Sequence, residues 1–174
     1  MSSSEPGVHR LYLLRHAESG NISADWRDAG RELTKHGRAQ ARAVGEVLAD
    51  AGIGLVLCSI AVRARQTAAL LGLSAPTNHL PALYNAGPRQ VLAEVAEVED
   101  TVKAVLVVAH APGIPSLVYS LADPDSDADA LARVRPMYPP ATLSGLEFTG
   151  SWSGLASARV FLTRVPPDRG IGLT

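Results

Sequence analysis

"LYLLRHAESG", residues 11–20, joins an apolar run to a cation and an imidazole at Arg15 and His16. The apolar run is typical of a buried β-strand, which we place at about residues 9–14. In open parallel α/β sheets, ligands bind just beyond the carboxyl ends of the strands, so the stretch predicts one edge of an active site. The alternative is that Arg15 is a solvated strand end and His16 a turn histidine that bonds its own backbone. This stretch by itself fits both interpretations.

Strands and helices alternate along the rest of the sequence. Short continuous apolar runs predict strands covered on both faces, and apolar residues at helical spacing predict amphipathic helices. The runs predict strands at 53–59 and 103–110, helices at 34–52, 61–73, 88–100 and 112–122, and two further strands at 141–148 and 158–165. This order predicts an α/β fold: a three-layer αβα sandwich with a mainly parallel central sheet and an antiparallel edge strand or hairpin near the C-terminus.

The chain is long enough for one complete domain. With 174 residues, 47% of them hydrophobic, it suits a single core, since domains commonly have roughly 100–200 residues. We expect the domain to span residues 9–166, with 1–8 and 167–174 as loose termini. Residues 123–140 are expected to form a loop-rich insertion, and whether it covers the site is left open.

Composition excludes several classes of protein. The net charge is −1 and lysines and arginines form no run, so the sequence carries no footprint of a protein that binds nucleic acid or an anionic membrane. The apolar run 104–109 is far shorter than the roughly 20 residues that span a bilayer. A single cysteine, Cys58, follows apolar residues and is expected in the core. We therefore expect a cytoplasmic protein that binds neither nucleic acid nor membrane.

Polar residues follow three separate predicted strands at the point where each strand ends. They are Arg15 with His16, the segment from Ser59 to Arg63, and His110. The carboxyl ends of parallel strands share one edge of the sheet, so two arginines and two histidines could face one crevice. Guanidinium groups match phosphate oxygens, a helix beginning near Pro112 would add backbone N–H groups, and a neutral imidazole can attack phosphorus. The sequence thus predicts a site for a phosphate dianion.

Three motifs in this order resemble a known family. "LRHAES", "CSIAVRARQT" and "VVAHAPG" are similar to the three signatures of the histidine phosphatase superfamily, which has the phosphoglycerate-mutase-like fold. The short chain and the segment "DAGRELTKHGRAQA", residues 28–41, resemble the SixA-type phosphohistidine phosphatases more than the longer mutases. The resemblance covers about residues 10–165.

The resemblance implies roles for four residues. His16 would be the nucleophile that becomes phosphorylated, Arg15 and Arg63 would bind the phosphoryl oxygens, and His110 would complete the cage. The family pattern Ser-x-x-x-Arg-Ala-x-Gln-Thr selects Arg63 and leaves Arg65 to point elsewhere.

Further residues have a less specific match. Asp28 and Arg31 fit the Asp-x-x-Arg-x-Leu-Thr pattern of SixA-like members, in which the acid lies at the mouth of the site and the arginine near the phosphate. They could equally be a solvated loop pair. Asp28 is the first candidate for a general acid and Glu18, in an exposed turn, the second. Ala111 stands where the family often has a polar residue, so it would offer phosphate only its backbone N–H.

The implied reaction consists of two in-line displacements. His16 takes the phosphoryl group, a leaving group departs, and water then hydrolyses the phosphohistidine. Because arginines supply the positive charge, no metal and no cofactor are expected. An alkoxide leaving group needs a proton, whereas the imidazole of a phosphohistidine needs less help, so the lack of a firm acid favours the latter substrate.

Three functions remain open from the sequence. The first is a metal-independent, SixA-like protein phosphohistidine phosphatase. The second is a small-molecule phosphomonoesterase that acts on a sugar phosphate, phosphoglycerate or nucleotide. The third is an inactive phosphate-binding module, because a fold alone does not imply a function. The partner is accordingly a phosphorylated protein histidine or a small phosphorylated metabolite.

Overall fold

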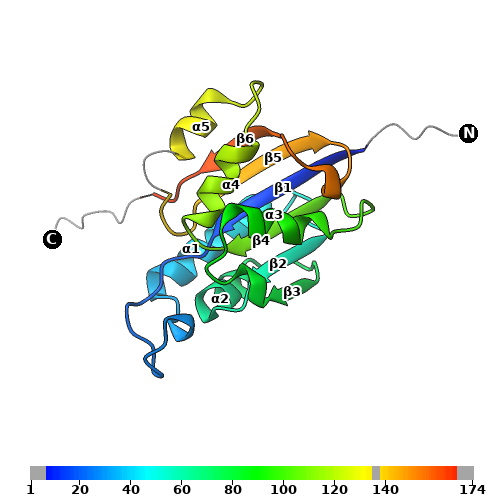
Figure 1. Ribbon diagram of the computed structural model, residues 1–174. Coiled ribbons are helices and arrows are strands. Elements are labelled where there is room, and N and C mark those ends of the chain that lie inside the picture. Colours follow the sequence, from blue (N-terminus) through cyan, green and yellow to red (C-terminus); the bar gives the residue numbers. More distant parts are fainter. Residues whose placement is uncertain (1–6, 135–137, 168–174) are drawn as a thin grey trace, which may run out of the picture.

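A six-stranded sheet in the order β3-β2-β4-β1-β5-β6 forms the centre of the molecule (Figure 1). The computed structural model describes residues 7–134 and 138–167. The strands are β1 (Val8–Arg15), β2 (Leu55–Ser59), β3 (Thr77–Leu80), β4 (Ala104–Ala109), β5 (Leu143–Thr149) and β6 (Arg159–Arg164). The first four strands run parallel, whereas β5 pairs antiparallel with both β1 and β6. The expected parallel sheet with an antiparallel C-terminal part is confirmed.

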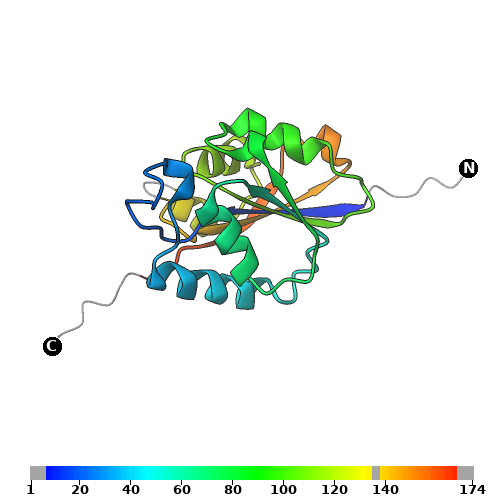
Figure 2. The same ribbon diagram turned by 90° about the horizontal axis from the view of Figure 1, so that it is seen from below.

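Helices cover both faces of the sheet (Figure 2). They are α1 (Lys35–Leu48), α2 (Val62–Leu70), α3 (Pro88–Ala96), α4 (Gly113–Leu121) and α5 (Ala128–Val134), with short 3-10 turns at η1 (Asp28–Gly30), η2 (Pro81–Leu83) and η3 (Trp152–Gly154). Helices α1 and α2 pack in one core cluster, whereas α3 and α4 pack in the other. This is the three-layer αβα sandwich that the sequence predicts. None of the helices in the described part of the chain has the length and hydrophobicity to cross a bilayer.

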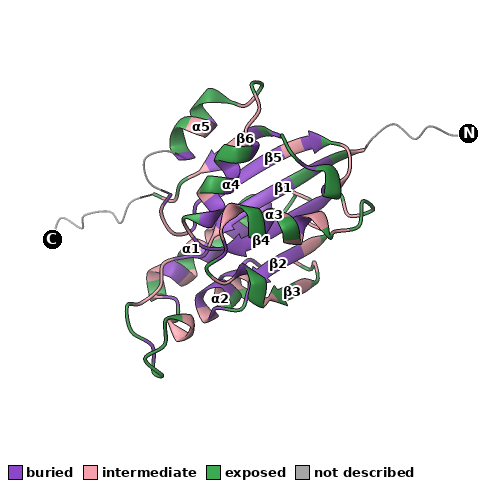
Figure 3. Ribbon diagram, in the orientation of Figure 1, coloured by how far each residue is buried: buried purple, intermediate pink, exposed green. Residues whose placement is uncertain are grey.

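The central strands are buried on both sides (Figure 3). Successive side chains of a strand point to opposite faces, so a strand covered by two helical layers must be apolar throughout. In β1, Leu11 and Leu13 join one core cluster while Tyr12 and Leu14 join the other. Strand β4 alternates in the same way. The continuous apolar runs in the sequence are explained by this double covering.

Helices α1 and α2 are followed by glycines, and α1 begins after a capping threonine, as the sequence predicts. The Thr34 side chain accepts a hydrogen bond from the Gly37 N–H at 3.0 Å and caps α1. Gly52 and Gly72, after α1 and α2, have φ angles of 67° and 69°, a left-handed conformation that favours glycine. Helix α4 begins at Gly113, where a side chain would collide with the Ala86 carbonyl oxygen. The close approach fixes the loop before α3 against the start of α4.

Two elements were not predicted. Strand β3 is a short edge strand with exposed Asn78 and His79, so it lacks the continuous apolar run of a central strand. Helix α5 lies inside residues 123–140, which were expected to be loop-rich. Asp127 caps it by accepting from the Ala130 N–H at 2.7 Å, and Arg133 donates to the Thr163 carbonyl of β6 at 3.2 Å. This helix therefore covers the β6 edge of the sheet; residues 135–137 of the same segment lie outside the described residues.

Candidate active site

Three parallel strands bring the polar segments to one edge of the sheet. His16 follows β1, Ser59 ends β2 and His110 follows β4. The pairing of Arg15 with Ala109 sets the ends of β1 and β4 level, and the His16 N–H continues the ladder by donating to the Ala109 carbonyl at 2.9 Å. The two histidine rings consequently lie with their centroids 5.2 Å apart.

His16 is held in a single tautomer. Its Nδ1 lies 2.7 Å from the Ala17 carbonyl oxygen, which can only accept, so Nδ1 carries the proton. The other ring nitrogen, Nε2, therefore carries no proton and accepts from Arg63 Nε at 3.2 Å. The ring is 6% exposed. A neutral, fixed and nearly buried imidazole is the form in which histidine is a nucleophile.

Arg63 links His16 to the loop between β1 and α1. It is 3% exposed, and besides His16 it donates to the Asp28 carbonyl at 2.8 Å and to Asp28 Oδ2 at 3.0 Å. Thr67 joins α2 to the backbone that follows His16. Its hydroxyl donates to the Arg63 carbonyl at 2.7 Å and accepts from the Ala17 N–H at 3.0 Å. Arg65, two residues further along α2, is exposed as expected.

His110 faces Arg63 and Ser59. Its Nδ1 is 3.5 Å from a terminal nitrogen of Arg63, which can only donate, so the proton belongs on Nε2. This Nε2 lies 2.7 Å from the Ser59 hydroxyl, which also accepts from the Ala61 N–H at 3.3 Å. Ser59 thus fixes the orientation of the second histidine ring.

Arg15 lies beside this cluster at the end of β1. One terminal nitrogen donates to the Tyr138 carbonyl at 2.8 Å, while Nε is buried and has no hydrogen-bond partner within the described residues. Burial and the neighbouring Arg63 lower the pKa of Arg15, yet a guanidinium remains charged at neutral pH. Two arginines therefore give the edge of the sheet a local positive charge. Across residues 7–134 and 138–167, no group of three or more His, Cys, Asp or Glu side chains could hold a metal ion.

Asp28 and Arg31 are part of the cluster. The Asp28 carboxylate accepts from Tyr84 at 2.7 Å, from Arg31 Nε at 2.9 Å and from Arg63 at 3.0 Å. Hydrogen bonds from Tyr84, Arg31 and Arg63 hold the pKa of Asp28 far below its usual range, although the side chain is 49% exposed. Arg31 also donates to the Ser19 hydroxyl at 3.1 Å. The structure thus joins Asp28 and Arg31 to Arg63, an arrangement different from the isolated solvated pair that the sequence also allowed.

Glu18 and Ala111 occupy the borders of the site. The Glu18 carboxylate accepts from the Thr34 hydroxyl at 2.7 Å, and its N–H donates to the Gln40 side chain at 2.9 Å, so it faces the start of α1. Ala111 lies between His110 and the start of α4 and is half-buried.

Tyr84 is the residue that sequence reasoning missed. It follows the short turn η2, donates to Asp28 and presents its ring edge-on to His110, with centroids 5.8 Å apart. Its hydrogen bond to Asp28 raises the pKa of the phenol. No local pattern marks this tyrosine, because its role depends on a contact with a loop 56 residues away in the chain.

Burial keeps both histidines neutral. Desolvation, opposed by the bond to the Ala17 carbonyl and assisted by the nearby positive charges, lowers the pKa of His16 to about 3. Desolvation together with Arg63 lowers the pKa of His110 to about 4. Both imidazoles are therefore neutral throughout the neutral and mildly acidic range.

These shifts predict that stability falls on acidification. Below pH 6.5, the ordinary histidine value, the unfolded chain binds protons at both positions while the folded protein does not. Each histidine should contribute a slope of about 1.4 kcal/mol per pH unit until the folded protein titrates. Urea unfolding from pH 7 to pH 4, in a buffer free of phosphate, measures this slope. A double variant His16→Gln, His110→Gln should show a flatter profile than the parent; equal slopes would contradict the expectation.

Comparison with known proteins places the chain in a family. The model of the histidine phosphatase superfamily (branch 1) matches residues 11–87. An uncharacterized protein of Mycobacterium leprae is 31% identical over 160 residues, 88% of this chain and 99% of that protein. The structure assigned as the phosphohistidine phosphatase SixA of Nakamurella multipartitia is 37% identical, with a TM-score of 0.82 over 94% of this chain and 99% of that one. The structure assigned as SixA of Agrobacterium tumefaciens is 26% identical, with a TM-score of 0.74 over 91% of this chain and 99% of that one.

The chain therefore belongs to the histidine phosphatase superfamily, and this confirms the resemblance carried by its three motifs. Membership, together with SixA structures among its neighbours, supports a phosphatase, that is, a hydrolase.

Proposed function

We propose that this protein is a phosphatase that forms a phosphohistidine on His16 and acts on phosphohistidine in a protein partner. The observation that carries the proposal is the state of His16: a buried neutral ring, Nδ1 fixed by the Ala17 carbonyl at 2.7 Å, and Nε2 directed toward Arg63. A phosphoryl group that enters the site replaces the 3.2 Å contact between Arg63 and Nε2 and is held by the same guanidinium.

The chemistry proceeds in two balanced steps. In the first, the Nε2 lone pair attacks phosphorus, an N–P bond forms, and the leaving group departs with the electrons of its bond to phosphorus. In the second, water attacks phosphorus from the vacated side, the N–P electrons return to Nε2, and the proton lost by water leaves with the phosphate. Arg15 and Arg63 stabilise the charge on the phosphoryl oxygens in both steps.

The state of Asp28 supports a phosphohistidine substrate. A carboxylate that accepts from Tyr84, Arg31 and Arg63 carries no proton at neutral pH and cannot serve as the acid for an alkoxide. The imidazole of a phosphohistidine takes up its proton on the ring nitrogen remote from phosphorus, so it leaves as a neutral molecule. We therefore assign Asp28 a positioning role: it orients the guanidinium of Arg63.

A second candidate function is supported by Tyr84. This phenol stays protonated, touches Asp28 at 2.7 Å and lies against His110. A proton source at this place is what a small-molecule phosphomonoesterase needs for its alkoxide leaving group.

Comparing substrates separates the two functions. The kcat/KM for a phosphohistidine peptide should exceed that for each of a sugar phosphate, a phosphoglycerate and a nucleotide, and Tyr84→Phe should leave the peptide value within a few fold. A preference for one monoester, lost in Tyr84→Phe, would establish the second function. Absence of a burst with an aryl phosphate, despite phosphate binding, would instead identify an inactive binding module.

Turnover should not depend on a metal ion. The positive charges that offset the phosphoryl group come from Arg15 and Arg63. In kinases, Mg²⁺ supplies this charge. We expect an unchanged rate after dialysis against EDTA, measured with a phosphohistidine peptide. Loss of turnover that Mg²⁺ or Zn²⁺ restores would refute this expectation.

A further inference from the structure

The loop between β1 and α1 carries a cavity beside the catalytic cluster, with which it shares Asp28 and Arg31. We propose that this cavity, with Trp26 at its rim, is a docking site for the polypeptide that flanks the phosphohistidine of a protein substrate. The inference rests on the proposed function and adds to it the element that recognises the partner.

The loop displays apolar side chains to solvent. It projects from the body of the molecule (Figure 1). Within it Trp26 is 83% exposed and Ile22 68% exposed. They are the two most exposed large hydrophobic side chains in the described part of the chain. Burial of apolar surface stabilises a protein by about 25 cal/mol per Å², and side chains left in solvent do not contribute this free energy. Tryptophan is also the residue most enriched among the contacts that dominate protein interfaces.

Hydrogen bonds hold the loop in this conformation. The buried Ser23 hydroxyl lies 2.7 Å from both Asp25 Oδ1 and the Arg27 carbonyl oxygen, and Asp25 Oδ1 also accepts from the Arg27 N–H at 3.1 Å. The Trp26 N–H donates to the Ser23 carbonyl at 3.2 Å. Trp26 has a φ of 57°, which is an uncommon and strained conformation for a bulky residue. The loop is therefore built to present the indole, and a preorganised element loses little entropy on binding.

The cavity is continuous with the catalytic cluster. Its lining consists of Asn21, Ile22, Ser23, Trp26, Arg27, Asp28 and Arg31. Asp28 and Arg31 are shared with the cluster, since Asp28 bonds Arg63 and Arg63 bonds His16. A group bound in the cavity is thus connected through Asp28 and Arg63 to His16.

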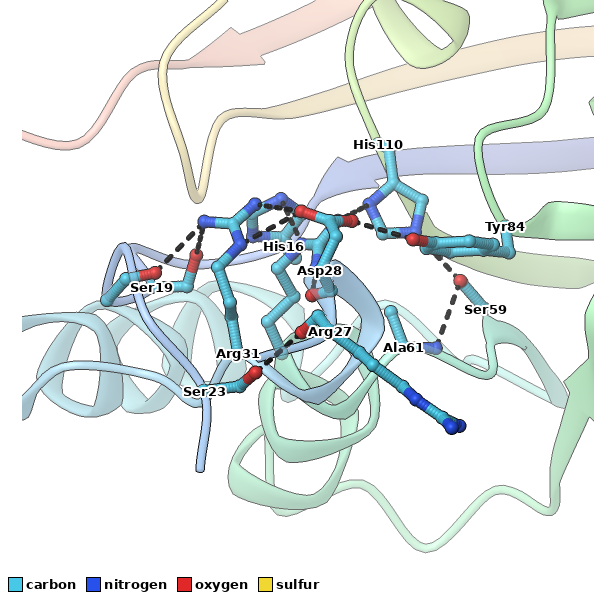
Figure 4. Close-up of polar contacts among 12 residues, drawn as sticks. His16, Ser19, Ser23, Arg27, Asp28, Arg31, Ser59, Ala61, Tyr84 and His110 are labelled. Atoms are coloured by element: carbon cyan, nitrogen blue, oxygen red, sulfur yellow. Dashed lines mark hydrogen bonds and ion pairs between the residues drawn. The ribbon is translucent and has the colours of Figure 1, made fainter. Parts of the chain in front are cut away.

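Size and charge indicate the occupant. The cavity measures about 230 Å³, below the range of roughly 300–1,000 Å³ that encloses a small ligand. It suits one side chain from a protein surface better than a whole metabolite. The exposed Arg27 side chain points away from Asp28 and the histidines (Figure 4), so its charge is available to a bound segment. The occupant we assign is a segment with an apolar residue and an acidic residue close to its phosphohistidine.

The test uses two substrates with the same reacting bond. One is free phosphohistidine, and the other is a phosphohistidine peptide with leucine and glutamate next to the modified residue. Trp26→Ala should raise KM for the peptide at least about fivefold, as expected for a contact that dominates an interface. The kcat/KM for free phosphohistidine should change less than twofold. Val47→Ala, which shortens another exposed apolar side chain on α1, should change neither value.

Tryptophan fluorescence gives a second readout that is independent of turnover. Trp26 is exposed and Trp152 is fully buried, so acrylamide quenches mainly Trp26. In His16→Ala, which cannot turn the substrate over, the phosphopeptide should protect Trp26 from acrylamide, whereas inorganic phosphate should not.

The outcomes distinguish the inference from the function on which it rests. Equal losses on both substrates in Trp26→Ala, or no loss on the peptide, would overturn the docking role while phosphohistidine hydrolysis still stood. Hydrolysis of monoesters with no hydrolysis of either phosphohistidine substrate would reject the proposed function, and the peptide docking site with it.

Discussion

Replacing His16 by alanine is expected to lower kcat for a phosphohistidine peptide at least about 1,000-fold, because no other group of the cluster can take its place as nucleophile. His110 is fixed by Ser59 beyond the end of β4, and the Asp28 carboxylate accepts hydrogen bonds from Tyr84, Arg31 and Arg63, so neither lies where the His16 ring lies at the end of β1. Arg15 and Arg63, to which we assign binding of the anion, remain in this variant. Product phosphate should therefore still inhibit or bind with an affinity near that of the parent, which isothermal titration measures.

His79→Ala is the matched control for this variant. His79 lies on the edge strand β3 and is exposed. Its replacement should leave kcat and phosphate binding unchanged. Thermal unfolding of both variants separates loss of chemistry from loss of fold. Near-normal turnover by a folded His16→Ala protein would contradict the assignment of the nucleophile.

Arg63→Gln is expected to lower kcat/KM by about 100- to 1,000-fold, the effect of removing a principal donor to developing negative charge. The guanidinium contacts His16 through Nε, and it contacts both Asp28 and His110 through one terminal nitrogen. Its loss should therefore remove phosphoryl binding and also loosen the loop that carries Asp28. Both KM and kcat should therefore change. Arg63→Lys keeps a positive charge without the planar fork of donors and should recover only part of the lost activity.

Arg65→Gln is the control for Arg63→Gln. Arg65 belongs to the same helix but is exposed, so its replacement should change kcat/KM less than twofold. Steady-state kinetics on the three variants is the measurement. Equal effects at positions 63 and 65 would show that general surface charge, and not the buried guanidinium, is responsible.

The sequence contains the information for the central sheet because burial on two faces leaves a simple pattern. Strand β4 is apolar at each of its six positions, and the residues at the ends of β1 and β4 could be aligned from the parallel direction alone. The proximity of His16, Arg63 and His110 follows from that geometry. The glycines after α1 and α2 mark the helix ends for a local steric reason.

Other features depend on contacts that no local pattern encodes. Strand β3 exposes half of its residues and pairs with β2 only on one side, so its apolar signal is weak. Helix α5 has seven residues, too few for a clear helical period, and depends on Asp127 and β6. The meeting of Tyr84 with Asp28 likewise requires two loops to approach in space.

The phosphoryl intermediate is the central claim, and rapid quench of the enzyme with a radiolabelled phosphohistidine peptide tests it most directly. The label should appear on the protein within one turnover, be lost in acid, survive base, and locate to His16 by mass spectrometry. Arg65→Gln should give the same yield, and His16→Ala should give none. Label on His110 or Asp28, or turnover in which no protein-bound phosphoryl group forms, would contradict the account.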